Sequence, residues 1–189
     1  MVYHRTGRLS PEYVLLGFLY RYPNHGYMLH KLLQAEFERI WHASQSQTYN
    51  ILKRLETQGY IKATLIKQQK LPPRQLFSIT ESGKLRFEDW LDKPTKPSVH
   101  AIRVEFISRL YFMQLYHPEK VLNMITLQVE VVTNGLNQQE QNLKELPGNQ
   151  KFNQLALELR IKLLQSVISW LIECSHSLEL AQQAGYDHE

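Results

Sequence analysis

Apolar residues in the first third of the chain recur at helical spacing in three short segments. The first follows Ser10-Pro11-Glu12, where a serine cap, a proline and an acid favour a helix start. The second covers residues 27–37, with Tyr27 among its inner positions, after a turn at residues 22–26. The third covers residues 44–61. The pattern therefore predicts three short helices in succession.

The segment at residues 44–61 has a well-marked start and end. Ser44 is placed to accept a hydrogen bond from the first turn, and Gln47 is placed to complete a capping box. Gly59 suits the left-handed conformation that ends a helix. One face of the helix is predicted to be buried, and it consists of Thr48, Ile51, Leu52 and Leu55.

The opposite face of this helix carries amide, hydroxyl and cationic side chains, with Glu56 as its single carboxylate. Such groups recognise base edges and phosphates in DNA complexes. An ordinary solvated helix face is the alternative that composition leaves open. Tyr49 lies between the two faces, where it would either pack on the second helix or hydrogen-bond a phosphate. The predicted contacts to base edges are Gln45, Ser46, Gln47 and Asn50.

An alternating pattern after this helix predicts a β-hairpin, with strands at residues 60–66 and 75–79 and a polar loop at residues 67–73. Three helices followed by a hairpin form a winged helix-turn-helix, whose last helix enters the major groove of DNA. The hairpin is then the wing, placed against backbone phosphate or the minor groove. The predicted cationic contacts to phosphate are Lys53, Arg54, Lys67, Lys70 and Arg74.

Charge is unevenly distributed along the chain. Residues 1–93 carry 14 Lys and Arg against 8 Asp and Glu, whereas residues 94–189 carry 8 against 10. A basic first half joined to a slightly acidic second half favours a polyanion-binding module with a second, different domain.

Several functional classes lack support in the sequence. No phosphate loop, metal-ligand motif or nucleophile elbow occurs, and Cys174 is the single cysteine. No apolar run reaches membrane-spanning length, and the first residues lack the apolar core of a signal peptide. We therefore expect a cytoplasmic protein that is not an enzyme, with no cofactor, no metal and no membrane contact.

A fourth helix is predicted from Thr80, its cap, to the end of a first domain at residues 1–93. Two prolines within residues 94–98 prevent helix continuation, so this segment is predicted as a linker. Residues 99–185 then form a helical domain.

The last two predicted helices are long, at about residues 118–146 and 150–183, and their apolar positions alternate spacings of three and four. These rows could pair within one chain, but further apolar surface beside them predicts contact with a second copy in a symmetric homodimer. A monomeric helical domain is the alternative. The predicted dimer residues are Leu157, Ile161, Leu164, Ile168, Trp170, Leu171 and Leu178.

In order and spacing, four short runs resemble the PadR family of transcriptional regulators. They are GYML at residues 26–29, YNILKRLE at 49–56, GYI at 59–61 and RQLFSITESG at 74–83. The run WHAS at residues 41–44 further resembles the longer PadR subfamily that includes a virulence activator of vibrios. The resemblance implies a dimeric, DNA-binding winged helix with an added C-terminal helical domain.

We therefore expect a mainly α fold with a small β-hairpin, built as a winged helix-turn-helix followed by a long-helix dimerisation domain. The expected function is that of a transcriptional regulator, with double-stranded DNA and a second copy of the chain as partners. A winged-helix adaptor that binds protein without reading DNA would share this fold. Some PadR relatives respond to small aromatic effectors between the domains, where Trp90, Tyr111 and Trp170 would line a pocket. The alternative is that these aromatics are core or dimer anchors.

Overall fold

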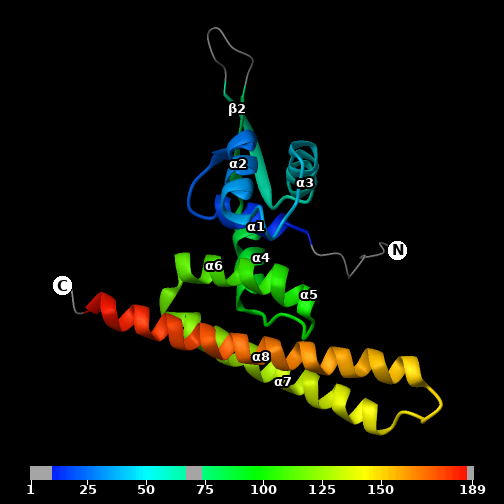
Figure 1. Ribbon diagram of the computed structural model, residues 1–189. Coiled ribbons are helices and arrows are strands. Elements are labelled where there is room, and N and C mark those ends of the chain that lie inside the picture. Colours follow the sequence, from blue (N-terminus) through cyan, green and yellow to red (C-terminus); the bar gives the residue numbers. More distant parts are fainter. Residues whose placement is uncertain (1–9, 67–73, 187–189) are drawn as a thin grey trace. The chain divides into compact units, whose positions relative to one another are not determined.

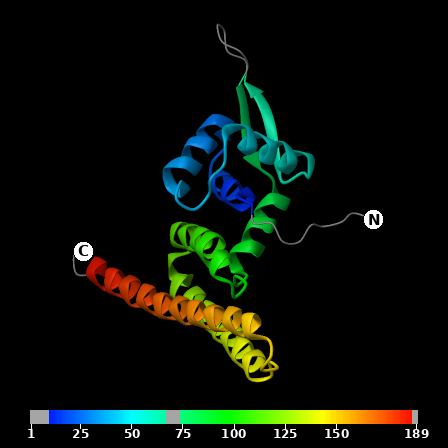
Figure 2. The same ribbon diagram turned by 45° about the vertical axis from the view of Figure 1, so that its right-hand side comes forward.

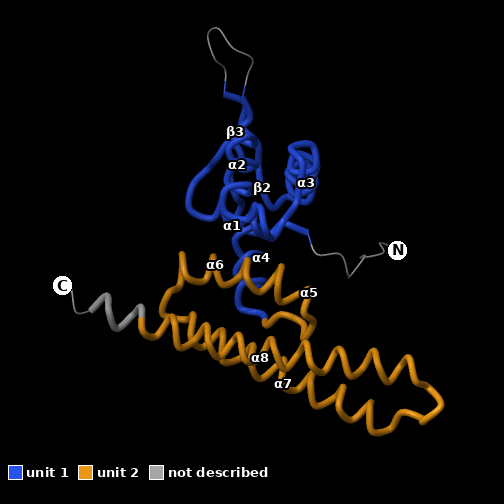
Figure 3. The backbone as a smooth tube through the Cα atoms, viewed as in Figure 1, with its two compact units in different colours: residues 1–93 blue, residues 94–189 orange. Residues whose placement is uncertain are grey.

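The chain divides into two units, residues 1–93 and residues 94–189, which Figure 3 shows in separate colours. The computed structural model describes residues 10–66 and 74–186, with side chains described up to residue 180. Most of this described part is helical, and its strands make one small antiparallel sheet. The predicted class, mainly α with a winged helix-turn-helix, is therefore confirmed. Within the described residues, no helix has both the length and the apolar character needed to span a membrane.

In the first unit, α1 is the central helix, because it contacts α2, α3, α4 and β3. Its residues Val14, Leu15, Leu16 and Leu19 are fully buried, which explains why α1 is apolar on most sides. Figures 1 and 2 show α3 beside the β2–β3 hairpin in two views. The elements of this unit are α1 (Glu12–Leu19), β1 (Asn24–His25), α2 (Gly26–Phe37), α3 (Gln45–Thr57), β2 (Ile61–Ile66), β3 (Arg74–Ile79) and α4 (Glu81–Asp92).

The sheet has the strand order β1-β3-β2, so the predicted hairpin gains a third strand. Ile61 of β2 lies opposite Ile79 of β3, and Asn24 of β1 lies opposite Phe77. The sequence predicts only a turn at residues 22–26. A strand of two residues is too short to show an alternating pattern, so only its pairing partner reveals it.

The junction between α3, the wing and α4 depends on very close backbone approaches. Gly59 has a φ of 77°, the left-handed conformation predicted for the end of α3. The Thr80 hydroxyl accepts from the Gly83 N–H at 3.1 Å and so caps α4, as predicted. A Cβ on Gly83 would lie 2.0 Å from the carbonyl oxygen of Tyr60. The RQLFSITESG run therefore has a structural role, because it holds the start of α4 against the end of α3.

The second unit contains a long helical hairpin, α7 and α8, which lie side by side in Figures 1 and 2. A π-helical turn interrupts the helix that precedes it. On α8, Ile161, Leu164 and Leu171 are buried within this unit. The elements are α5 (Val99–Ala101), η1 (Ile102–Phe106), α6 (Ile107–Tyr116), η2 (Pro118–Lys120), α7 (Val121–Lys144) and α8 (Lys151–Tyr186).

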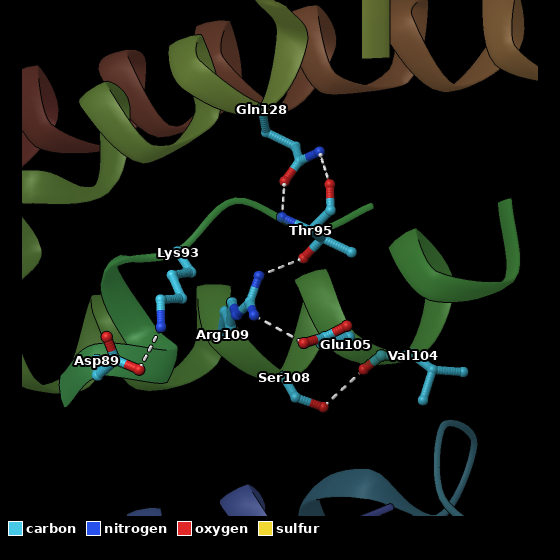
Figure 4. A network of polar contacts seen from close by, with 8 residues as sticks. All are labelled: Asp89, Lys93, Thr95, Val104, Glu105, Ser108, Arg109 and Gln128. Carbon is cyan, nitrogen blue, oxygen red and sulfur yellow. Dashed lines mark hydrogen bonds and ion pairs between the residues drawn. The ribbon is translucent and has the colours of Figure 1, made fainter. Parts of the chain in front are cut away.

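The segment predicted as a linker belongs to the second unit, where a polar clamp holds Thr95 (Figure 4). The Gln128 side-chain oxygen accepts from the Thr95 backbone N–H at 2.7 Å, and its Nε2 donates to the Thr95 carbonyl at 2.9 Å. Arg109 donates through Nη1 to the Thr95 hydroxyl at 2.7 Å and through Nη2 to Glu105 at 2.7 Å. Because Thr95 and Gln128 are each 1% exposed, water is not available to replace these bonds.

We predict that Gln128→Ala lowers the free energy of unfolding by roughly 2 to 5 kcal/mol, because it leaves two buried backbone groups of Thr95 without a partner. Chemical denaturation measures the change. The matched control is Gln138→Ala on the same helix, whose amide bonds Asn142 at the exposed surface, and it should cost less than about 0.5 kcal/mol. Equal small losses in both variants would show that the clamp adds no stability.

Candidate nucleic-acid interface

The start of α3 carries the predicted capping box. The Ser44 hydroxyl accepts from the Gln47 backbone N–H at 3.2 Å, and the Gln47 side-chain oxygen accepts from the Ser44 N–H at 2.8 Å. This reciprocal pair satisfies backbone donors that a helix start would otherwise leave free. The Gln47 carbonyl is thus used within the protein, and its amino group is the part left for another partner.

The inner face of α3 is buried as predicted, with Ile51, Leu52 and Leu55 in the core. Thr48 is also fully buried, and its hydroxyl donates to the Ser44 carbonyl at 3.2 Å. The Thr48 oxygen is then free to accept, and the His30 Nδ1 of α2 lies 3.1 Å away. This contact pins α2 to α3, so the orientation of α3 is fixed by polar as well as apolar contacts.

The predicted DNA-contacting residues of α3 all lie on its solvent-exposed side. Their polar groups are amides, hydroxyls and two cations, as the sequence predicts. Glu56, the one carboxylate among α3 residues, accepts from the Ala63 N–H of β2 at 3.3 Å. The exposed set is Gln45, Ser46, Gln47, Tyr49, Asn50, Lys53 and Arg54.

One of the two cations, Arg54, is already paired. Its Nη2 donates to Glu12 Oε2 of α1 at 2.7 Å, while Glu12 Oε1 accepts from Arg86 of α4 at 2.5 Å. Ser10 does not cap α1 as predicted: the N-cap position is Pro11, and the Ser10 hydroxyl accepts from Arg54 at 3.3 Å. The serine lies one residue before the cap, so it reaches across to α3. No ion pair of Lys53 occurs in the described part of the chain, which makes Lys53 the unneutralised cation of α3.

Arg86 joins this ion pair to the base of the wing. Its guanidinium carbon lies 4.4 Å from the ring centroid of Tyr60 and 5.2 Å from that of Tyr13. Burial lowers the pKa of Arg86, but a hydrogen bond with Tyr60 and interactions with Tyr13 and Glu12 outweigh it, so the net pKa is raised. Burial raises the pKa of Tyr13. Arg86 therefore keeps its positive charge at neutral pH.

Tyr49 packs against the start of α2, one of the two roles that the sequence leaves open. A Cβ on Gly26 would lie 2.8 Å from Tyr49 Cε1, so the ring occupies the space that a side chain at that position would need. Tyr49 as a whole is still 38% exposed. Tyr49 is thus held by α2 while part of its ring remains open to a partner.

The base of the wing places a cation beside this contact. Arg74 is exposed at the start of β3, and its guanidinium carbon lies 5.9 Å from the ring centroid of Tyr27. Tyr27 is 38% exposed and does not take the inner position predicted for it, because it is the second residue of α2, at the edge of the core. The predicted contacts Lys67 and Lys70 lie outside the described residues.

The predicted effector pocket draws its residues from both units, and each lies against an aromatic neighbour of its own unit. Trp90 is stacked on Tyr13 with ring centroids 4.8 Å apart. Tyr111 meets the edge of Phe112 at 5.0 Å, and Trp170 meets Phe106 at 6.2 Å. These contacts favour core roles for the three residues, and the effector pocket stays a prediction.

The predicted dimer residues of α8 form an inner row, of which Ile161, Leu164 and Leu171 are buried inside the unit and Leu157, Ile168, Trp170 and Leu178 are half-buried. A second apolar row, which sequence analysis did not separate from the first, faces solvent at spacings of three and four. We call it the outer row, and it consists of Phe152, Leu155, Leu159 and Leu163. The residues of the outer row also recur at spacings of three and four in the sequence. Only the position of α7 in the structure shows which of the two rows is covered.

Comparison with protein families matches both units. Residues 15–89 match the model of the Transcriptional regulator PadR-like family, and residues 102–179 match a second model, Virulence activator alpha C-term. These matches confirm the resemblance predicted from the sequence.

Two curated relatives match parts of this chain. The Negative transcriptional regulator PadR of Bacillus subtilis is 28% identical over 120 residues, which are 63% of this chain and 65% of the relative. A probable transcriptional regulator of Mycobacterium tuberculosis is 24% identical over 90 residues, 48% of each chain. The chain thus spans less than two thirds of the length of the curated relatives it matches.

The solved structures that are similar to this chain include a PadR–DNA complex and a virulence activator. Bacillus subtilis PadR in complex with operator DNA is 23% identical, with 88% of this chain and 98% of that chain covered and a TM-score of 0.44. The Vibrio cholerae virulence activator AphA is 23% identical, with 91% and 99% covered and a TM-score of 0.39.

We predict that Gly26→Ala lowers the free energy of unfolding by about 1 kcal/mol, because the new methyl group displaces the Tyr49 ring. The same substitution in a Tyr49→Ala background should cost nothing, since the space is then empty. A double-mutant cycle by chemical denaturation measures the difference. An equal cost in both backgrounds would rule out a direct contact between Gly26 and Tyr49.

Proposed function

We propose that this chain, which belongs to the PadR-like family of transcriptional regulators through residues 15–89, is a sequence-specific DNA-binding regulator. In this proposal α3 enters a major groove and the β2–β3 wing lies along the backbone. The protein acts as a homodimer on a two-fold related site, and it works in the cytoplasm, as expected from the sequence.

The observation that carries this proposal is the outer face of α3. It presents exposed amides, hydroxyls and Lys53, which has no ion pair among the described residues. The capping box fixes the start of this helix, and contacts of Thr48 and Arg54 fix its rotation about its axis. Rigid presentation matters, because base readout requires donors and acceptors to meet base edges within hydrogen-bond distance.

In this proposal, different side chains supply the sequence specificity and the affinity for DNA. Asn50 and Gln45 carry the two-sided amides suited to adenine, and Ser46 adds a hydroxyl donor or acceptor. Lys53 and Arg74 attract backbone phosphate and release counterions. Arg54 contributes less than the sequence predicts, because Glu12 already compensates its charge.

The outer row of α8 supports the homodimer. Phe152 is 86% exposed and Leu159 is 59% exposed, so the described part of the chain leaves the row uncovered as an apolar stripe. Two-fold pairing of such stripes would bury both at once. In this proposal the inner row stabilises the protomer and the outer row joins two protomers.

Selection of bound duplexes from random DNA tests the regulator, and a two-fold related consensus is the expected result. With that duplex, Asn50→Ala should reduce the ratio of specific to random-DNA affinity by roughly tenfold, the worth of one bidentate base contact. Lys53→Ala should weaken binding to both DNAs alike and reduce the salt slope by about one. Fluorescence anisotropy at several salt concentrations measures both effects.

Two results would contradict this proposal. If no duplex is enriched while the chain binds a protein partner, the adaptor function replaces the regulator. If Asn50→Ala and Lys53→Ala change the two affinities in the same way, the division between readout and charge is wrong.

The dimer is tested by placing charge on the outer row. The double variant Leu159→Glu with Leu163→Glu should sediment as a monomer at roughly micromolar concentration, because burying four carboxylates in a two-fold interface is strongly unfavourable. The matched control is Leu85→Glu on α4, an exposed leucine of the first unit, which should leave the dimer intact. A monomeric wild-type protein, or an unchanged dimer in the double variant, would exclude the outer row as the interface.

A further inference from the structure

A cavity of about 620 Å³ opens where the starts of α2 and α3 meet the base of the wing. Its lining includes His25 and Tyr27 from the start of α2, Tyr49 from α3 and Arg74 from β3. The three elements that a winged helix applies to DNA therefore share one concave surface. Of these four residues, only Tyr49 and Arg74 are predicted from the sequence to contact DNA.

The cavity is positively charged. Arg74 and Lys31 both lie against the Tyr27 ring, at 5.9 Å and 5.7 Å from its centroid. No carboxylate is among the lining residues, which are His25, Gly26, Tyr27, Tyr49, Leu65, Arg74 and Gln75. Its charge and its hydroxyl groups suit an anion that accepts hydrogen bonds.

The walls restrict which anion fits. His25 and Tyr27 are stacked with ring centroids 6.3 Å apart, and the His25 ring is held in place by its Nδ1, 3.0 Å from the Gln75 carbonyl. The volume far exceeds that of one phosphate group and suits a phosphate with an attached sugar, whose ring carbons pack on aromatic faces. The ligand that best suits this cavity is therefore a sugar phosphate.

We propose that this cavity seats one deoxyribose phosphate of the DNA backbone, next to the groove that α3 reads. This inference rests on the proposed function and adds Tyr27 to its DNA contacts, with the Lys31 charge against the Tyr27 ring. One phosphate held by α2, α3 and the wing sets the register of α3, because backbone contacts position a protein on the duplex without reading sequence. Tyr27 is accordingly a positioning residue for readout by Asn50.

The same chemistry could come from a free nucleotide, and the two sources behave differently. A backbone phosphate belongs to the duplex and is counted in its salt dependence. A free deoxynucleoside monophosphate would bind without DNA and would compete with the duplex.

The test uses the full chain, the selected duplex and a panel in which single phosphates are replaced by uncharged methylphosphonate. For wild-type protein, one position in each half-site should weaken binding by roughly tenfold, the worth of a charge-assisted hydrogen bond. The variants Arg74→Gln and Tyr27→Phe should bind less tightly and lose their sensitivity at that position alone. Lys53→Ala is the matched control, and it should keep that sensitivity. Thermal denaturation of each variant verifies that it is folded.

Three outcomes separate the inference from the proposed function. If no duplex binds, the proposed function fails. If duplexes bind with a consensus but Arg74→Gln and Tyr27→Phe remain sensitive at every phosphate, the cavity does not seat the backbone. If deoxyadenosine monophosphate at micromolar concentration displaces the duplex, and Tyr27→Phe removes that displacement, the cavity is a nucleotide site and the backbone assignment is overturned.

Discussion

The two ion pairs of the Glu12 carboxylate are the interactions on which the arrangement of helices in the first unit depends. Each of its oxygens holds one guanidinium, that of Arg54 on α3 and that of Arg86 on α4. The side chain of Glu12 is 14% exposed, whereas those of Arg86 and Arg54 are 28% and 47% exposed, so water and salt screen the pair with Arg54 more than the pair with Arg86. Since Arg86 also covers the rings of Tyr13 and Tyr60, one carboxylate on α1 sets the position of α3, α4 and the first residue before the wing.

The ion pair with Glu12 determines which cation of α3 is available to bind phosphate. Arg54 lies on an exposed helix face and has the residue type that binds phosphate, yet its charge is compensated within the fold. Lys53, its neighbour in sequence, has a side chain directed by the helix to a different face and has no such partner in the described residues. Sequence identifies both as candidates, and only the contact with α1 distinguishes them.

Features set by neighbouring residues could be predicted from the sequence. The capping box of α3 needs only Ser44 and Gln47 three residues apart, and the end of α3 needs only Gly59. The buried stripe of α3 likewise follows from helical spacing. These features define the position and outer face of the candidate reading helix.

Features set by residues far apart in sequence could not be predicted. Gln128 has a polar side chain of a type that is usually exposed, but it is buried because Thr95, 33 positions earlier, offers it both a donor and an acceptor. The two apolar rows of α8 have the same spacing, so periodicity cannot say which one α7 covers. The cavity beside Tyr27 depends on β3 reaching α2, which no local pattern records.

The clamp on Thr95 also bears on how the two halves of the chain could work together. α4 ends at Asp92, and Thr95 is already fixed in the second unit, so the free chain between them is short. A short connection transmits a change in one unit to the other more faithfully than a flexible linker does. If the outer row joins two protomers and α3 reads DNA, the contacts to bases and the selection of half-site spacing then reside in separate units that are joined by a short segment of chain. Substitutions in the outer row would therefore alter which spacings are bound while leaving the base contacts of each α3 unchanged.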